Sequence, residues 1–259
     1  MENYLVMKVT FLGTGTSMGV PIIGCKCEIC QSQNPKDQRF RSSVLVSVDN
    51  KNFIVDTGPD FRMQCLKNHV QHIDAVLITH IHRDHIAGLD DIRPFCYQQK
   101  AFIPVYGSEY VCQRLERDFS YCFGENRYPG VPDIELHRID DQPFEVLGVK
   151  VVPIIVMHAK MKVDAYRFDN FTYITDASFI SEESVKKIEG TEYLVVNALR
   201  KEPHPSHFTL QQALDLISRI NPKHAWITHV GHTLGFYDEV QASLPENVTL
   251  AYDGLQVEF

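Results

Sequence analysis

Two hydrophobic patterns alternate along this chain: short apolar runs typical of strands and amphipathic segments typical of helices. The apolar runs predict strands at 4–13, 74–79, 102–107, 149–158, 192–199 and 224–228, with further strands over 132–176 and from 248 to the end. Helical spacing predicts helices at about 108–119, 181–188, 209–220 and 234–243.

Turn and cap residues mark the ends of several of these elements. Asp49-Asn50 lies within residues 43–58 and Asp169-Asn170 lies between two later apolar runs, so each pair predicts a hairpin. Thr209 followed by Gln212 is a capping-box pattern, which predicts a helix N-terminus at that point.

The order of elements indicates an α/β protein. Two β-rich halves, each interleaved with helices, suggest two sheets packed face to face with helices outside, although other α/β layerings stay open. The chain has 259 residues, of which 44% are hydrophobic, enough for a sizeable core. We expect a single domain over 1–259.

Charge and composition narrow the classes of partner. The net charge is −8 and no Lys/Arg-rich run is present, so a nucleic-acid partner is not expected. The N-terminal residues read as a strand rather than a signal peptide, and no apolar run is long enough to span a membrane. We expect a cytoplasmic protein without a membrane partner. The oligomeric state is not readable from the sequence, and a homodimer stays open.

Cysteines fall into two groups. Cys25, Cys27 and Cys30 lie within "GCKCEIC" and predict a metal site that needs a fourth ligand, with a reduced, metal-free loop as the alternative. The other four lie in apolar or helical contexts and are expected in the core, at Cys65, Cys96, Cys112 and Cys122.

The chemistry is concentrated in "THIHRDH", residues 79–85, directly after a predicted buried strand. His80, His82, Asp84 and His85 crowd into one loop, and such a set suits zinc and similar divalent metals. A His-rich surface loop is the alternative. Further candidate ligands end other predicted strands and could converge on one sheet edge: Asp56, His158, Asp176 and His229.

These residues resemble the metallo-β-lactamase superfamily, whose H-x-H-x-D-H signature matches "HIHRDH" and whose remaining partners follow in the same order. The resemblance covers essentially the whole chain and implies an αββα four-layer sandwich. It also implies a first metal on His80, His82 and His158, and a second on Asp84, His85 and His229. Asp176 would bridge the two metals, and Asp56 would orient the loop through hydrogen bonds.

Two such ions can hold a bridging hydroxide and clamp a phosphorus centre during in-line displacement. The expected catalytic residues are Asp84 and His207. His207 precedes a predicted helix N-terminus and could bind phosphate or act as general acid. His204 is the competing choice, and a plain loop residue is the alternative. Arg62, Arg93 and Arg127 could meet a substrate phosphate or be structural partners, and residues 120–131 could form a lid or pocket wall.

Three segments resemble the PhnP-like cyclic phosphodiesterase branch of that superfamily: 13–30, "DTGPDFR" (56–62) and "THVGH" (228–232). The branch implies a structural zinc on Cys25, Cys27, Cys30 and His232. We therefore expect a phosphodiesterase acting on a small, cyclic phosphate ester, with two zinc or manganese ions plus the structural zinc. The alternatives are a ribonuclease Z-like, thioester or lactone hydrolase, or a non-catalytic cofactor-binding member like the pyrroloquinoline-quinone synthesis protein.

Overall fold

A computed structural model describes residues 6–124 and 127–259. Residues 4–5 of the first predicted strand and residues 125–126 of the predicted 120–131 loop lie outside the described residues. The chain divides into two compact units. The first takes its residues from 1–12, 43–140 and 254–259, and the second from 13–42 and 141–253. Whether these units form one domain, as the sequence predicts, stays a prediction.

A mixed seven-stranded sheet forms the first unit, in the order β14-β1-β2-β3-β4-β5-β6. Its strands are β1 (Met7–Gly13), β2 (Ser43–Val48), β3 (Lys51–Val55), β4 (Ala75–Leu77), β5 (Ile103–Ser108), β6 (Ile134–Ile139) and β14 (Gln256–Glu258). Strands β3, β4, β5 and β6 are parallel neighbours, so the loops that follow β3 and β4 leave from the same sheet edge.

Four α-helices accompany this sheet among the described residues: α1 (Phe61–Lys67), α2 (Arg83–Ile86), α3 (Arg93–Gln99) and α4 (Glu109–Asp118). They share one core with the sheet, in which Phe61 of α1, Phe95 of α3 and Leu115 of α4 are buried with strand residues. Short 3₁₀ turns lie at Leu89–Ile92 and Ser120–Cys122. All four cysteines expected in the core are buried.

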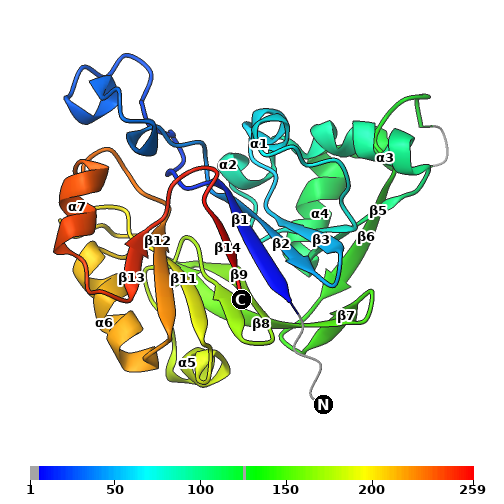
Figure 1. The fold of residues 1–259 in the computed structure, drawn as a ribbon. Helices are drawn as coiled ribbons and strands as arrows, with labels where there is room; N and C mark the ends of the chain where they lie inside the picture. Colours follow the sequence, from blue (N-terminus) through cyan, green and yellow to red (C-terminus); the bar gives the residue numbers. More distant parts are fainter. Residues whose placement is uncertain (1–5, 125–126) are drawn as a thin grey trace. The chain divides into compact units, whose positions relative to one another are not determined.

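A second mixed seven-stranded sheet forms the second unit, in the order β13-β12-β11-β10-β9-β8-β7. Its strands are β7 (Phe144–Val146), β8 (Val149–His158), β9 (Met161–Phe168), β10 (Phe171–Tyr173), β11 (Tyr193–Asn197), β12 (His224–Thr228) and β13 (Val248–Leu250). Helices α5 (Glu182–Ile188), α6 (Leu210–Ile220) and α7 (Tyr237–Ser243) pack against it (Figure 1) and bury Ile188, Ile217 and Val240 in its core. Residues 13–42 add two 3₁₀ turns, Ile29–Gln31 and Pro35–Asp37.

The predicted turn and cap residues are confirmed. Asp49 and Asn50 join β2 to β3 with φ of 49° and 63°, the left-handed conformation that a two-residue hairpin favours. Asp169, with φ of 49°, turns β9 into β10. The Thr209 side chain accepts a hydrogen bond from the Gln212 backbone, and the Gln212 side chain accepts one from the Thr209 backbone, which starts α6.

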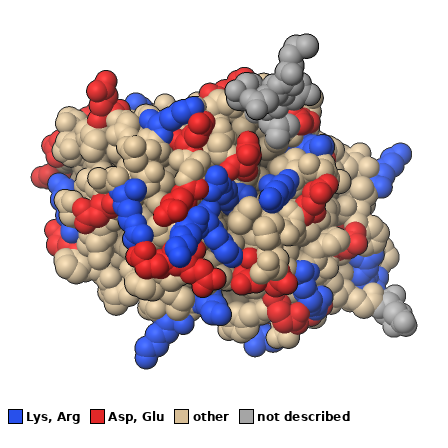
Figure 2. Space-filling model, turned by 90° about the horizontal axis from the view of Figure 1, so that it is seen from below, with Lys and Arg blue, Asp and Glu red and all other residues tan. Residues whose placement is uncertain are grey.

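The two seven-stranded sheets with their helices confirm the predicted α/β class. No helix among residues 6–124 and 127–259 is long and apolar enough to cross a membrane. On the face drawn in Figure 2, basic and acidic side chains are interspersed rather than gathered by sign, which agrees with the lack of a basic run in the sequence.

Candidate metal centre

The histidine loop, residues 79–85, follows β4 in the first unit and runs into α2, whose first three residues are Arg83, Asp84 and His85. His80 is 1% exposed and His85 is fully buried, whereas His82 is exposed. Asp84 is half-buried and its carboxylate lies beside the His85 ring. We call His80, His82, Asp84 and His85 the first donor set. The sequence predicts all four on one loop; the structure brings their side chains together but places Asp84 and His85 in α2.

Asp56 organises this loop from the end of β3. Its carboxylate accepts hydrogen bonds from the Thr79 backbone and the Thr79 hydroxyl, both at 2.8 Å, and from Nδ1 of His85 at 2.6 Å. Complete burial raises the pKa of Asp56, while the His85 and Thr79 contacts act to lower it. The orienting role that the family pattern implies for Asp56 therefore has a direct physical route.

These hydrogen bonds also fix the tautomers of two histidines. The Thr79 hydroxyl has one proton and donates it to Asp56, so it can only accept from Nδ1 of His80, 2.9 Å away. Nδ1 of His85 donates to Asp56. Both rings are therefore protonated at Nδ1, which leaves the Nε2 lone pair to act as a ligand atom.

The ligand atoms then fall into two pairs. Nε2 of His80 lies 3.1 Å from Nδ1 of His82, and Nε2 of His85 lies 3.1 Å from an Asp84 carboxylate oxygen. Two ligands of one tetrahedral zinc ion are separated by about 3.3 Å, given metal–ligand distances near 2.05 Å. The spacing of these atoms, with the acceptor character of Nε2 in His80 and His85 and of the Asp84 carboxylate, fits divalent cations.

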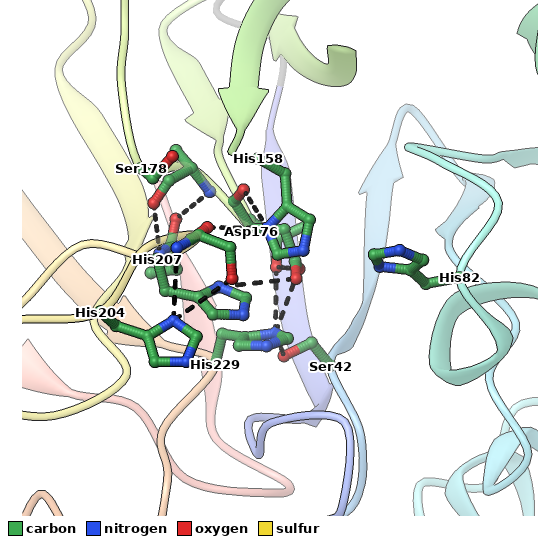
Figure 3. A network of polar contacts seen from close by, with 12 residues as sticks. Ser42, His82, His158, Asp176, Ser178, His204, His207 and His229 are labelled. Atoms are coloured by element: carbon green, nitrogen blue, oxygen red, sulfur yellow. Dashed lines mark hydrogen bonds and ion pairs between the residues drawn. The ribbon is translucent and has the colours of Figure 1, made fainter. Parts of the chain in front are cut away.

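His158, Asp176 and His229 lie together in the second unit (Figure 3). His158 ends β8, while Asp176 and His229 follow the parallel strands β10 and β12 with φ of 57° and 56°. All three are at least nine-tenths buried. We call them the second donor set.

Hydrogen bonds orient both rings of the second donor set. Nδ1 of His158 donates to the backbone carbonyls of Ser206, at 2.7 Å, and Asp176, at 3.1 Å. The Ser42 hydroxyl donates to the Gly15 carbonyl and lies 3.1 Å from Nδ1 of His229. That nitrogen therefore donates and also lies 3.1 Å from an Asp176 carboxylate oxygen. Again Nε2 is left as the ligand atom in each ring.

His207 stands over this set. Its ring centroid is 4.6 Å from that of His158 and 4.7 Å from that of His229, and its Nδ1 lies 3.7 Å from Asp176 Oδ1. Nδ1 is buried and has no hydrogen-bond partner. Burial, with the nearby His229, lowers the pKa of His207 to about 3, so the ring is neutral at pH 7. His204 stacks on its outer side at 5.2 Å.

The cysteine cluster consists of Cys25, Cys27, Cys30 and His232, all half-buried in the second unit. The three sulfur atoms lie 3.5, 3.3 and 3.4 Å from Nδ1 of His232. Sulfur and nitrogen ligands of one tetrahedral zinc ion would be about 3.5 Å apart, given bond lengths of about 2.3 and 2.05 Å. The backbone N–H of Cys30 lowers the pKa of Cys27 to about 6, which favours a thiolate. The donor set fits a structural zinc.

The candidate phosphate-binding arginines mostly contact protein groups. Arg93 donates to the Gly130 carbonyl, and Arg127 pairs with Asp133 at 3.0 Å. Arg62 lies on the exposed side of α1. Residues 127–131 form the wall of a cavity of about 290 Å³, together with Cys96, Tyr97 and Asp133. The contacts of Arg93 and Arg127 favour the structural alternative for these two.

Sequence analysis missed the neutral residues that orient the ligands. Thr79, Thr175 and Ser206 directly precede the candidates His80, Asp176 and His207, and Thr175 donates to Asp176 at 2.7 Å. Asn197, at the end of β11, holds the backbone of Ala177 through both its amide atoms. The signal available was a hydroxyl residue directly before a ligand in "ITH" and "ITD".

Comparisons with known proteins agree with this geometry. A family model described as a β-lactamase superfamily domain matches residues 51–230. A crystal structure described as a new diphosphatase from the PhnP family is 39% identical, with a TM-score of 0.92 over 99% of this chain and 98% of that one.

Two curated relatives are similar over different lengths. An octanoyltransferase of Porphyromonas gingivalis is 36% identical over 253 residues, 96% of this chain but 51% of the relative. The chain thus spans about half of that protein's length. Coenzyme PQQ synthesis protein B of Methylobacterium radiotolerans is 34% identical over 101 residues, 34% of each chain.

Proposed function

Because the chain belongs to the β-lactamase superfamily and, within it, to the PhnP family, we propose that it is a metal-dependent hydrolase that cleaves a small phosphate ester. The observation that carries the proposal is the orientation of the histidines. Four buried rings, those of His80, His85, His158 and His229, are each hydrogen-bonded through Nδ1 and leave Nε2 for a metal.

We propose the ligand assignment that the family pattern implies. His80, His82 and His158 would hold one ion, Asp84, His85 and His229 the other, and Asp176 both. Within the first donor set, the two 3.1 Å pairs support this division. Nitrogen and carboxylate ligands suit zinc and manganese. When bound, such ions activate water at neutral pH and stabilise negative charge on phosphoryl oxygens.

The side chains of this chain would then position the ester and its leaving group. His207 lies against the second donor set and two residues before Thr209, the N-cap of α6, where the helix dipole favours a negative charge. The neutral ring can donate its one N–H to a substrate oxygen. Asp176, 3.7 Å away, would keep the ring in place. We also propose that the cysteine cluster holds a structural zinc that pins residues 25–30 to His232.

A second candidate is hydrolysis of a phosphoanhydride, since the 39%-identical structure is described as a diphosphatase. Both reactions displace an oxygen from phosphorus and would use the same residues. We carry over no acyl transfer from the octanoyltransferase, because about half of that relative lies outside the match.

The test is a substrate panel on the chain loaded with zinc or manganese. It contains bis(p-nitrophenyl) phosphate, a ribose 1,2-cyclic phosphate, a dinucleoside diphosphate, a lactone and a precursor tRNA. Asp84→Asn removes a proposed ligand. Asp74→Asn is the matched control, because the Asp74 carboxylate accepts a hydrogen bond from the Asn52 backbone N–H at 2.7 Å.

We expect cleavage of the cyclic phosphate or the diphosphate by wild type and Asp74→Asn, and at least a hundredfold loss in Asp84→Asn. Absence of phosphorus–oxygen cleavage in the metal-loaded wild type contradicts the proposal. Lactone or tRNA turnover alone would favour the other hydrolases of the fold, and bound metal without any turnover would favour a cofactor-binding role.

A further inference from the structure

Asp118, the last residue of α4, sits under three arginines. Its carboxylate contacts Arg114 at 2.8 Å, Arg83 at 3.1 Å and Arg117 at 3.2 Å, and its side chain is only 7% exposed. Arg114 and Arg117 are its neighbours on the same helix. Arg83 comes from the histidine loop, between His82 and Asp84.

The helix that carries Asp84 and His85 cannot hold its own conformation. It has four residues, and His82 at its N-cap makes no side-chain capping bond. Helices this short are unstable without tertiary contacts. Its C-terminal side is fixed by backbone bonds, from the Thr57 N–H to the His85 carbonyl and from the Gly88 N–H to the Thr57 carbonyl, both at 2.8 Å.

Its N-terminal side is where Arg83 reaches Asp118. An arginine at the first helical position opposes the helix dipole, which favours negative charge there, so a compensating partner is expected. Asp118 provides this compensating negative charge. Its position is fixed, because α4 buries Val111, Cys112 and Leu115, and Arg114 and Arg117 hydrogen-bond to the Asp118 carboxylate.

We propose that Asp118 is a positioning residue for the metal centre, acting through Arg83. The ion pair holds the first turn of α2 and keeps the guanidinium away from Asp84. Without Asp118, Arg83 is free to pair with the Asp84 carboxylate, its nearest acidic neighbour in sequence, and so to compete with the metal. The inference rests on the proposed metal binding, and it adds a residue outside the family's ligand pattern.

The test is a double-mutant cycle read out as Mn²⁺ affinity. The chain, with its cysteine cluster loaded with zinc, is titrated with Mn²⁺ and the free ion is followed by electron paramagnetic resonance. The variants are Asp118→Asn, Arg83→Ala and the double variant. Glu116→Gln is the matched control. Glu116 lies on the same helix as Asp118, but its ion pair, at 2.7 Å, is with Arg138 of β6 rather than with the histidine loop.

We expect Asp118→Asn to weaken Mn²⁺ binding about fivefold, as an ion pair with one exposed partner, Arg83, would allow. In the Arg83→Ala background, Asp118→Asn should not change the Mn²⁺ affinity further, because the ion pair with Arg83 is already absent. Glu116→Gln should bind as wild type does. The melting temperature of the Mn²⁺-free chain, measured alongside, should be the same for Asp118→Asn and Glu116→Gln.

Unchanged affinity in Asp118→Asn, or an equal loss in both backgrounds, overturns the inference and leaves the proposed function standing. A wild-type chain that binds no Mn²⁺ overturns both. If Asp118→Asn does not fold, Arg83→Ala replaces it in the test. Mn²⁺ affinity of Arg83→Ala that is within twofold of wild type, or higher, then overturns the inference. A lower affinity that Arg83→Lys restores supports it.

Discussion

The carboxylate of Asp56 orients two histidines of the first donor set by different routes. It bonds directly to His85 and reaches His80 through the Thr79 hydroxyl. A single side chain therefore sets the tautomer of one ring from each proposed metal pair. The sequence predicts that Asp56 orients the loop. It does not reveal that Thr79 links Asp56 to His80, because a threonine hydroxyl next to a histidine can hydrogen-bond to many different partners.

Asp56→Asn should weaken metal binding by about 10- to 100-fold, the usual range for groups that orient ligands. The asparagine amide offers one acceptor oxygen where the carboxylate offers two, so its N–H₂ would face a donor from Thr79 or His85. Metal content after equilibration at buffered free zinc measures the effect. Asp74→Asn, in the same unit, is the control and should bind normally; a normal metal content in Asp56→Asn would refute the orienting role.

His207→Ala should lower kcat on a phosphodiester by about 100-fold or more, the size expected for a group that assists proton transfer or the leaving oxygen. The metal content should not change. His204→Ala, which removes the outer ring of the stack, should have a much smaller effect. A lower metal content in His207→Ala would instead identify His207 as a ligand, since it lies within coordinating range of His158 and Asp176.

Among the elements, those with a strong local signal were predicted closely. Strand β8 has the bounds expected from its apolar run, and α6 starts at its predicted cap. Helices α1, α2 and α3 were not predicted. They have at most seven residues and no capping side-chain bond, so tertiary packing rather than local sequence specifies them.

Close packing of the turn after α2 also limits its residues. A Cβ on Gly88 would lie 2.0 Å from the Gly58 carbonyl oxygen, in the segment just after Asp56. Gly88→Ala should therefore cost about 1–3 kcal/mol in the free energy of unfolding, and metal binding should weaken with it. Urea unfolding measures the cost. The exposed neighbour Ala87 provides the control, because Ala87→Ser should stay within about 0.5 kcal/mol of wild type.

For the whole molecule, the predicted metallo-β-lactamase fold is confirmed by the family match and by the 39%-identical structure. The order of strands within each sheet could not be predicted from the sequence. Residues 13–42 join the second unit and residues 254–259 the first, through pairings such as β1 with β14 across nearly the entire chain. Local patterns carry no information about such distant partners.

The cysteine cluster extends this long-range organisation, since it joins residues 25–30 to His232. His232→Ala should remove one zinc from an expected total of about three per chain and leave the two other ions in place. Metal analysis by mass spectrometry, with the substrate panel as a check on the catalytic ions, measures this. An unchanged zinc content would show that the three thiolates do not share His232 as a ligand.

Asp253 predicts a pH dependence of stability. Asp253 is half-buried and its carboxylate accepts hydrogen bonds from the N–H groups of Thr14 and Phe40, and desolvation raises its pKa from 3.8 to about 6. The folded chain thus holds this proton more tightly than the unfolded chain does. The associated stability is present below pH 3.8 and is lost as pH rises towards 6, by at most about 3 kcal/mol.

Urea unfolding of wild type and Asp253→Asn between pH 4 and pH 7 measures this effect. The difference between the two should shift in favour of the variant as pH rises, whatever the variant's absolute stability. Parallel pH profiles would contradict the assignment.

Asp56, Asp176 and His229 all have φ between 56° and 66°, where a side chain costs roughly 1 kcal/mol and glycine costs little. Selection for thermal stability alone, on chains grown without metal, could therefore relieve this strain with glycine at Asp176 or His229, whereas Asp56 is held by the three hydrogen bonds that its carboxylate accepts. Selection for activity would hold all three residues fixed. Directed evolution of this protein would have to screen for stability and activity together, because a variant with a higher melting temperature can be one that has lost its activity.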